Sequence, residues 1–264
     1  MDGALLARKI DRMDKFFHKN SVFCFTSDVD WAPESAIAKT IDVFKRLDLP
    51  ATFFVTHQSK VISREFRGRN ERVGVHPNFL HGSTHGDTIE DQVKTARELW
   101  PGAKAFRAHA YYDNTLVLRA MYASGFEYDS NSFEFMQPYI SPLLHHTGLV
   151  RFPVFWEDDI HGEGHEFRLS EIRGNLEKPG LKVFNFHPLW VSLNIPSVES
   201  YRKNKFLAGA EHRADAVIDG RAFVGRGALT FLEEVAAYIS KRKRSVALLN
   251  DLYEQVLQGF DDAR

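Results

Sequence analysis

Two kinds of hydrophobic pattern alternate along the chain. Short runs of consecutive apolar residues are typical of strands buried on both faces, whereas apolar residues at every third or fourth position are typical of helices packed on a sheet. The runs predict strands at residues 22–25, 50–56, 72–76, 105–109, 126–129, 149–155 and 181–187. The periodic segments predict helices at residues 5–17, 32–47, 88–100, 114–123, 227–241 and 246–260.

Strands that alternate with helices predict parallel βαβ units and an α/β fold. The chain has 264 residues, enough to bury one large core. We therefore expect a single domain over residues 1–264, with its core at about residues 21–190 and the helices of residues 227–260 closing it. Residues 130–148 carry Pro138 and Pro142 and show no period, and residues 201–221 are polar and have no predicted structure.

Composition excludes several classes of protein. The formal net charge is −1, so no basic field favours binding to nucleic acid. Cys24 is the single cysteine, which excludes a disulfide within the chain and most thiolate zinc sites. Residues 1–20 carry several charged side chains where a signal peptide would be apolar, and no apolar run reaches about 18 residues. We expect a cytoplasmic protein without a transmembrane segment, whose oligomeric state the sequence does not give.

Ionisable residues recur where the predicted strands end. The carboxyl ends of parallel strands meet at one edge of a barrel, so we expect these residues to form one site there. Asp28 and Asp30 lie two positions apart, and an extended backbone would point both side chains the same way. A metal ion is the usual way to offset the cost of burying two carboxylates together. The residues at these ends are Asp28, Asp30, His76, Arg107, His109, Asp129, Glu157, Asp158, Asp159, His161 and His187.

Five short motifs follow one another in an informative order. They are TSDVD at 26–30, ATFFV at 51–55, VGVH at 73–76, FR at 106–107 and FNFHP at 184–188. In these motifs the chain resembles the polysaccharide deacetylase (NodB homology) family, and residues 28–34, 76–79 and 155–161 resemble its WbmS-like branch. The resemblance implies a distorted (β/α) barrel of about seven parallel strands. It also implies metal-dependent removal of an N-acyl group, N-acetyl in the first place, from an amino sugar.

The resemblance also implies a role for each matching residue. Asp28 matches the catalytic base and Arg107 the arginine that orients this base. His187 matches the general acid that protonates the leaving amine. Asp30 and His76 match two metal ligands. An Asp/His/His set suits Zn²⁺ first, with Fe²⁺, Co²⁺ and Ni²⁺ as alternatives.

The third metal ligand departs from the family pattern. The family has a second histidine four positions after the first, where this chain has Leu80. The candidates are His109, His85 and His81. We prefer His109, because on a strand the residue two positions after Arg107 faces the same side.

The expected substrate is a nucleotide-linked or lipid-linked amino sugar of surface polysaccharide (O-antigen-type) biosynthesis. Two other functions stay open: hydrolysis of another C–N bond, as in a cyclic imide or ureide, and carbohydrate binding without catalysis. A binding protein would need a metal ligand but not a base, its arginine and an acid together. The residues expected to contact the substrate are Trp31, Asn78, Asp129, Glu157, Asp158 and His161.

Overall fold

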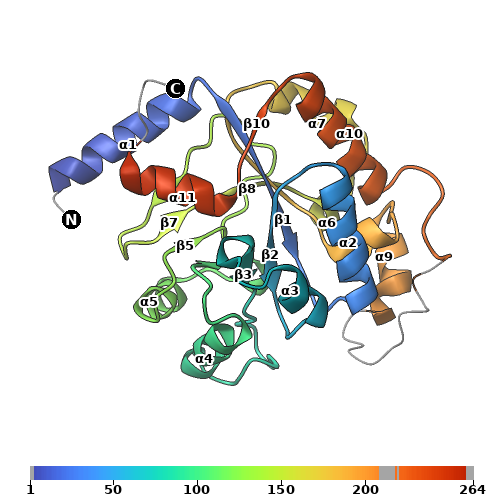
Figure 1. Ribbon diagram of the computed structural model, residues 1–264, viewed down its shortest axis with the longest axis horizontal. Coiled ribbons are helices and arrows are strands. Elements are labelled where there is room, and N and C mark those ends of the chain that lie inside the picture. The colour runs from blue at the N-terminus through green and yellow to red at the C-terminus, as the bar shows by residue number, and fades with distance from the viewer. Residues whose placement is uncertain (1–2, 208–217, 219, 260–264) are drawn as a thin grey trace.

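The strands form one curled, mostly parallel sheet in the computed structural model, which describes residues 3–207, 218 and 220–259 (Figure 1). The sheet order is β6-β7-β5-β4-β3-β2-β1-β9-β8, with β10 beside β1. Among the described strands, β6 and β7 form the antiparallel pair. The strands are β1 (Ser21–Asp28), β2 (Ala51–Val55), β3 (Val73–Val75), β4 (Ala105–Phe106), β5 (Tyr128–Asp129), β6 (Leu143–Leu144), β7 (Val150–Arg151), β8 (Val154–Glu157), β9 (Gly180–Asn185) and β10 (Ser245–Val246).

The two ends of this sheet come together through β7 and β8. β7 pairs with β5, whereas β8, only two residues further along the chain, pairs with β9. Between β7 and β8, Phe152 N donates to the Asp129 carbonyl, and Val154 N at the start of β8 donates to the Ser132 carbonyl. The pairing with β5 and the residues after it therefore continues through the bend. If β7 and β8 are taken as one bent strand, seven parallel strands form the wall: β1, β2, β3, β4, β5, β7/β8 and β9. The distorted barrel that the family resemblance implies is confirmed.

Helices cover the outside of this sheet and one of its ends (Figure 1). The longer predicted helices are all present, and the short ones at 60–65, 158–161, 169–176, 188–192 and 198–204 are not evident in the sequence pattern. The helices are α1 (Gly3–Phe17), α2 (Glu34–Arg46), α3 (Lys60–Glu65), α4 (Ile89–Leu99), α5 (Thr115–Ala123), α6 (Asp158–His161), α7 (Leu169–Leu176), α8 (Pro188–Ser192), α9 (Val198–Asn204), α10 (Ala228–Lys241) and α11 (Leu249–Gln258), with 3-10 turns at Asn70–Arg72, His109–Tyr111 and Lys205–Leu207.

Several predicted boundaries differ from the structure, and two of these differences change the type of element. The strand predicted over 105–109 ends at Phe106, and the chain then turns into the 3-10 turn His109–Tyr111. The helix predicted over 246–260 begins at Leu249, because the residues before it form β10 beside β1. Position 260, like most of the polar stretch after Leu207, lies outside the described residues.

The strands are apolar along their whole length because both faces are buried. In β1, Val22 and Cys24 belong to an inner cluster, whereas Phe23 and Phe25 belong to an outer one. The outer cluster packs under α2 and α10. The inner cluster includes side chains of α1 and α11, which cover the amino ends of the strands side by side (Figure 1).

Polar residues replace apolar ones toward the carboxyl ends of the inner face. The alternation that places Cys24 inside also places Thr26 and Asp28 inside, and in β9 it places Asn185 above Val183. These side chains are buried, and they hydrogen-bond to one another or to Arg107. The candidate site therefore lies on top of the inner cluster, at the carboxyl edge of the barrel.

Candidate active site and metal centre

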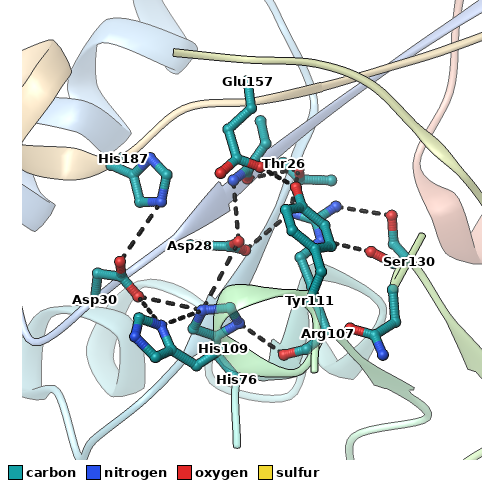
Figure 2. A network of polar contacts seen from close by, with 12 residues as sticks. Thr26, Asp28, Asp30, His76, Arg107, His109, Tyr111, Ser130, Glu157 and His187 are labelled. Carbon is teal, nitrogen blue, oxygen red and sulfur yellow. Dashed lines mark hydrogen bonds and ion pairs between the residues drawn. The ribbon is translucent and has the colours of Figure 1, made fainter. Parts of the chain in front are cut away.

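Asp28 is the last residue of β1, and both of its carboxylate oxygens are held. Oδ1 accepts a hydrogen bond from Arg107 Nη1 at 2.9 Å (Figure 2). Oδ2 accepts one from Asn185 Nδ2 at 3.0 Å. The carboxylate is 2% exposed. A buried carboxylate with a charge-assisted bond is fixed in direction and compensated in charge.

Arg107 is completely buried and is held by other groups besides Asp28. Its Nε donates to the Ser130 carbonyl at 2.7 Å, and its Nη2 donates to Ser130 Oγ at 2.7 Å. Nη1 also donates to Thr26 Oγ1 at 3.0 Å. Sequence reasoning missed Asn185 and Ser130, since neither stands out by type or spacing. Only the strand pairing places them beside the Asp28–Arg107 pair.

Asp30 reaches the site by a turn of the backbone rather than by strand alternation. β1 ends at Asp28, and Asp30 and Trp31 have φ of 45° and 53°, in the left-handed region. Such conformations cost on the order of 1 kcal/mol each in residues other than glycine, and they occur often at functional sites. Trp31 N donates to Thr56 Oγ1 at 3.0 Å, which supports the turn. The extended geometry predicted for Asp28–Asp30 is therefore wrong, although both carboxylates face His76.

Asp30, His76 and His109 bring one ligand atom each within 4.8 Å of one another. Asp30 Oδ1 lies 3.2 Å from His76 Nε2 and 3.2 Å from His109 Nδ1 (Figure 2). This oxygen is buried and has no hydrogen bond of acceptable geometry. One carboxylate oxygen and two imidazole nitrogens that converge in this way are a donor set typical of divalent transition metals.

Hydrogen bonds fix the ring of His76 and the backbone of His109 in position beside Asp30. His76 Nδ1 donates to the Arg107 carbonyl at 2.6 Å, which leaves the lone pair of Nε2 directed at Asp30. His109 N donates to the Pro77 carbonyl at 2.9 Å. Strand alternation does not place His109, because β4 has already ended. The turn His109–Tyr111 does so instead.

The ionisable groups of this cluster shift one another's pKa values. Burial opposes ionisation of Asp30, but its contacts with His109 and His76 and the charge of His187 prevail and hold its pKa well below the usual range. Burial also opposes protonation of His109, yet contact with Asp30 raises its pKa above the ordinary value. Asp30 is thus anionic, as a metal ligand must be.

The two alternative third ligands differ from His109 in their surroundings. His85 is buried, its Nδ1 accepts from Asn78 N at 3.0 Å, and its Nε2 donates to the Thr56 carbonyl at 2.8 Å. Both ring nitrogens are therefore used by the backbone. His81 is exposed in the loop after β3 and belongs to no group of converging metal-ligand atoms in the described residues.

His187 lies on the opposite side of Asp30 from the two histidines (Figure 2). Its Nε2 is 3.6 Å from Asp30 Oδ2, and its Nδ1 donates to Asp158 Oδ1 at 2.6 Å. Asp158 Oδ2 accepts from His187 N at 2.8 Å. Burial opposes the charge on His187, but Asp158 and Asp159 raise its pKa well above the usual value, which favours the imidazolium form.

Three of the residues expected to contact a sugar are buried and have protein partners in the structure. Asp158 is fully buried and holds His187 with both oxygens. Asp129 is also fully buried, and Arg151 Nε donates to its two oxygens at 3.0 and 2.9 Å. His161 is buried among aromatic rings and donates from Nε2 to the Glu166 carbonyl.

Of the other three, Trp31 and Asn78 are half-buried at the rim of the site, whereas Glu157 is buried. Trp31 is half-buried, with its ring edge-to-face against His109 at 5.1 Å. Asn78 is half-buried and accepts a hydrogen bond from Leu80 N in the loop after β3. Glu157 accepts a hydrogen bond from the Tyr111 hydroxyl, and burial and the charge of Asp159 raise its pKa well above the usual value. Glu157 and Asp159 also come within 4.8 Å of His187 through their ligand atoms.

A family model for WbmS-like polysaccharide deacetylases matches residues 25–205. The chain belongs to this family. A solved structure of WbmS from Bordetella bronchiseptica, assigned to polysaccharide deacetylation in O-antigen biosynthesis, is 26% identical and superposes with a TM-score of 0.68, covering 82% of this chain and 90% of that one.

A polysaccharide deacetylase structure from Mycobacterium smegmatis is 16% identical, with a TM-score of 0.47 and coverage of 87% and 93%. No curated protein matches the sequence. Membership of the WbmS-like family makes the protein a deacetylase by class. Among the helices that the structure describes, none combines the length and the apolar character that crossing a bilayer requires.

Proposed function

We propose that this WbmS-like protein is a metal-dependent N-deacetylase that removes an acetyl group from an amino sugar in surface polysaccharide biosynthesis. The family match supports deacetylation, and the O-antigen assignment of the Bordetella relative supports the class of sugar. The observation that carries the proposal is the arrangement of the site. A donor set of Asp30, His76 and His109 lies between a buried carboxylate, Asp28, and an imidazole of raised pKa, His187.

The residues present fit a divalent metal. Asp30 Oδ1, His76 Nε2 and His109 Nδ1 would hold the ion, and the orphaned buried oxygen of Asp30 would gain a partner. Such an ion, when bound, polarises an amide carbonyl and acidifies water. Zn²⁺ is the first candidate for a site of one carboxylate and two imidazoles, with Fe²⁺, Co²⁺ and Ni²⁺ as alternatives.

Asp28 and His187 would move the protons of the reaction. Asp28 Oδ2 lies 3.8 Å from His76 Nε2, so the carboxylate borders the donor set and is placed to accept a proton from the attacking water. Arg107 and Asn185 keep it oriented. His187 would donate the proton on Nε2 to the departing nitrogen. The hydrogen bond from His187 Nδ1 to Asp158 favours the charged imidazole and fixes the orientation of its ring.

A binding protein without catalysis does not account for these features. Burying the Asp28–Arg107 and His187–Asp158 pairs costs desolvation energy, since buried ion pairs rarely repay it in stability. Both pairs nevertheless lie at the edge of the donor set, where a catalyst needs a base and an acid. We therefore retain deacetylation as the proposed activity.

A pair of isosteric substitutions separates the base from the ligand. Asp28→Asn should retain bound Zn²⁺ and lower acetate release from N-acetylated amino sugars by at least about 100-fold, because only proton transfer is lost. Asp30→Asn should lose both the metal and the activity. Metal content after dialysis and acetate release are measured side by side, with thermal unfolding as the check on folding. The opposite result, an empty Asp28→Asn and a metal-bound Asp30→Asn, would show that the two roles are reversed.

A further inference from the structure

The turn that carries His109 has an unfavourable backbone conformation. Its next two residues, Ala110 and Tyr111, have φ of 54° and 50°, and neither is a glycine. The His109 side chain is 26% exposed, so packing encloses it only in part. A left-handed pair of this kind persists only where contacts from outside the turn hold it.

Tyr111 supplies such a contact across the mouth of the barrel. Its hydroxyl donates to Glu157 Oε2 at the carboxyl end of β8 (Figure 2). Its ring stacks on Phe133 with centroids 5.4 Å apart. Glu157 is 4% exposed and directly precedes Asp158, the residue that holds His187. The bond therefore ties the turn that carries one candidate metal ligand to the wall that holds the candidate acid.

We propose that the Tyr111–Glu157 hydrogen bond positions His109 for metal binding. The inference rests on the proposed metal site and assigns Tyr111 and Glu157 as positioning residues rather than ligands. On one side, the backbone bond to Pro77 and the ring of Trp31 limit where His109 can lie. On the other side, the Tyr111 bond keeps the turn from relaxing and carrying Nδ1 away from Asp30. Groups that orient a ligand in this way typically change metal affinity by 10–100-fold.

The test measures Zn²⁺ affinity by competition with a chromophoric chelator. Tyr111→Phe removes only the hydroxyl and keeps the ring on Phe133, so we expect it to lower the affinity about tenfold. Tyr112→Phe is the matched control, because Tyr112 is 39% exposed and its ring stacks on Phe79, away from Glu157. Its Zn²⁺ affinity should equal that of the wild type. An unchanged affinity in Tyr111→Phe would overturn the inference.

The same substitution in a His109→Ala background decides how Tyr111 acts. If the hydroxyl works by positioning His109, Tyr111→Phe has no further effect on Zn²⁺ affinity once the imidazole is absent. If the bond only supports the barrel mouth in general, Tyr111→Phe lowers the affinity equally in both backgrounds, and the inference is wrong. A wild-type protein that binds no Zn²⁺ contradicts both this inference and the proposed function, whereas normal binding that is insensitive to Tyr111→Phe contradicts this inference alone.

Discussion

His85 and His109 show how residues of one type acquire different roles. The sequence offers both as candidate ligands, but it does not show that the partners of His85 are backbone groups at Asn78 and Thr56. His109 instead directs Nδ1 toward Asp30, whose other neighbour in the set is His76. The sequence singled out His109 through strand alternation, but the turn after β4 is what brings it there. The ligand assignment itself stays a prediction.

Three alanine substitutions test that assignment. His109→Ala should weaken Zn²⁺ binding by more than about tenfold, because it removes a direct ligand rather than a supporting group. His81→Ala should leave Zn²⁺ affinity unchanged, since the side chain is exposed. His85→Ala should lower the melting temperature, because the Thr56 carbonyl and Asn78 N–H lose a buried partner, while bound Zn²⁺ stays at one ion per chain. If His81→Ala or His85→Ala loses more Zn²⁺ affinity than His109→Ala, the third ligand is assigned wrongly.

Among the elements, helices and strands of clear period were predictable, whereas short ones were not. β4 and β5 pair over two residues each, and their limits depend on neighbours far along the chain. The bend between β7 and β8 could not be foreseen, because it comes from pairing with β5 on one side and β9 on the other. The ion pair of Asp129 could not be foreseen for a similar reason, because its partner, Arg151, lies on β7.

The junction between α2 and α3 gives a pH-dependent prediction. Glu34 accepts hydrogen bonds from Lys60 N, Val61 N and Ser59 Oγ at the start of α3. Burial opposes ionisation, but these three bonds lower its pKa below the ordinary value of 4.5. A carboxylate with a lowered pKa contributes stability above the unfolded-state pKa, and this contribution is lost as the pH falls through the folded-state value.

Glu34→Gln should therefore destabilise the protein near pH 7 by about 1 kcal/mol, comparable with the loss of a helix cap. The deficit measured at pH 7 should shrink at a second pH well below 4.5, because the folded-state pKa lies below that value. Denaturant unfolding at both pH values measures it, with Glu98→Gln, at an exposed position on α4, as the control. A deficit that stays constant over this range would show that the charge of Glu34 does not support α3.

The whole molecule is a barrel. Its interior is apolar toward the amino ends of the strands, and its carboxyl edge is charged. The sequence predicted this division, because ionisable residues follow the apolar runs in strand after strand. It could not predict which of them pair with one another. Asp158 and His187 are hydrogen-bonded although they lie 29 residues apart in the sequence, and Arg107 and Asp28 are hydrogen-bonded across a separation of 79 residues. Such pairs depend on the strand order, which places β1 between β2 and β9.

Chelation and reconstitution of the wild-type protein test the central claim most directly. Protein stripped of metal should release no acetate from N-acetylated amino sugars of nucleotide-linked or lipid-linked form. Activity should return in proportion to added Zn²⁺ and saturate at about one ion per chain, as one donor set of Asp30, His76 and His109 requires. Full acetate release by the metal-free protein, or a stoichiometry unaffected by His76→Ala, would contradict the account.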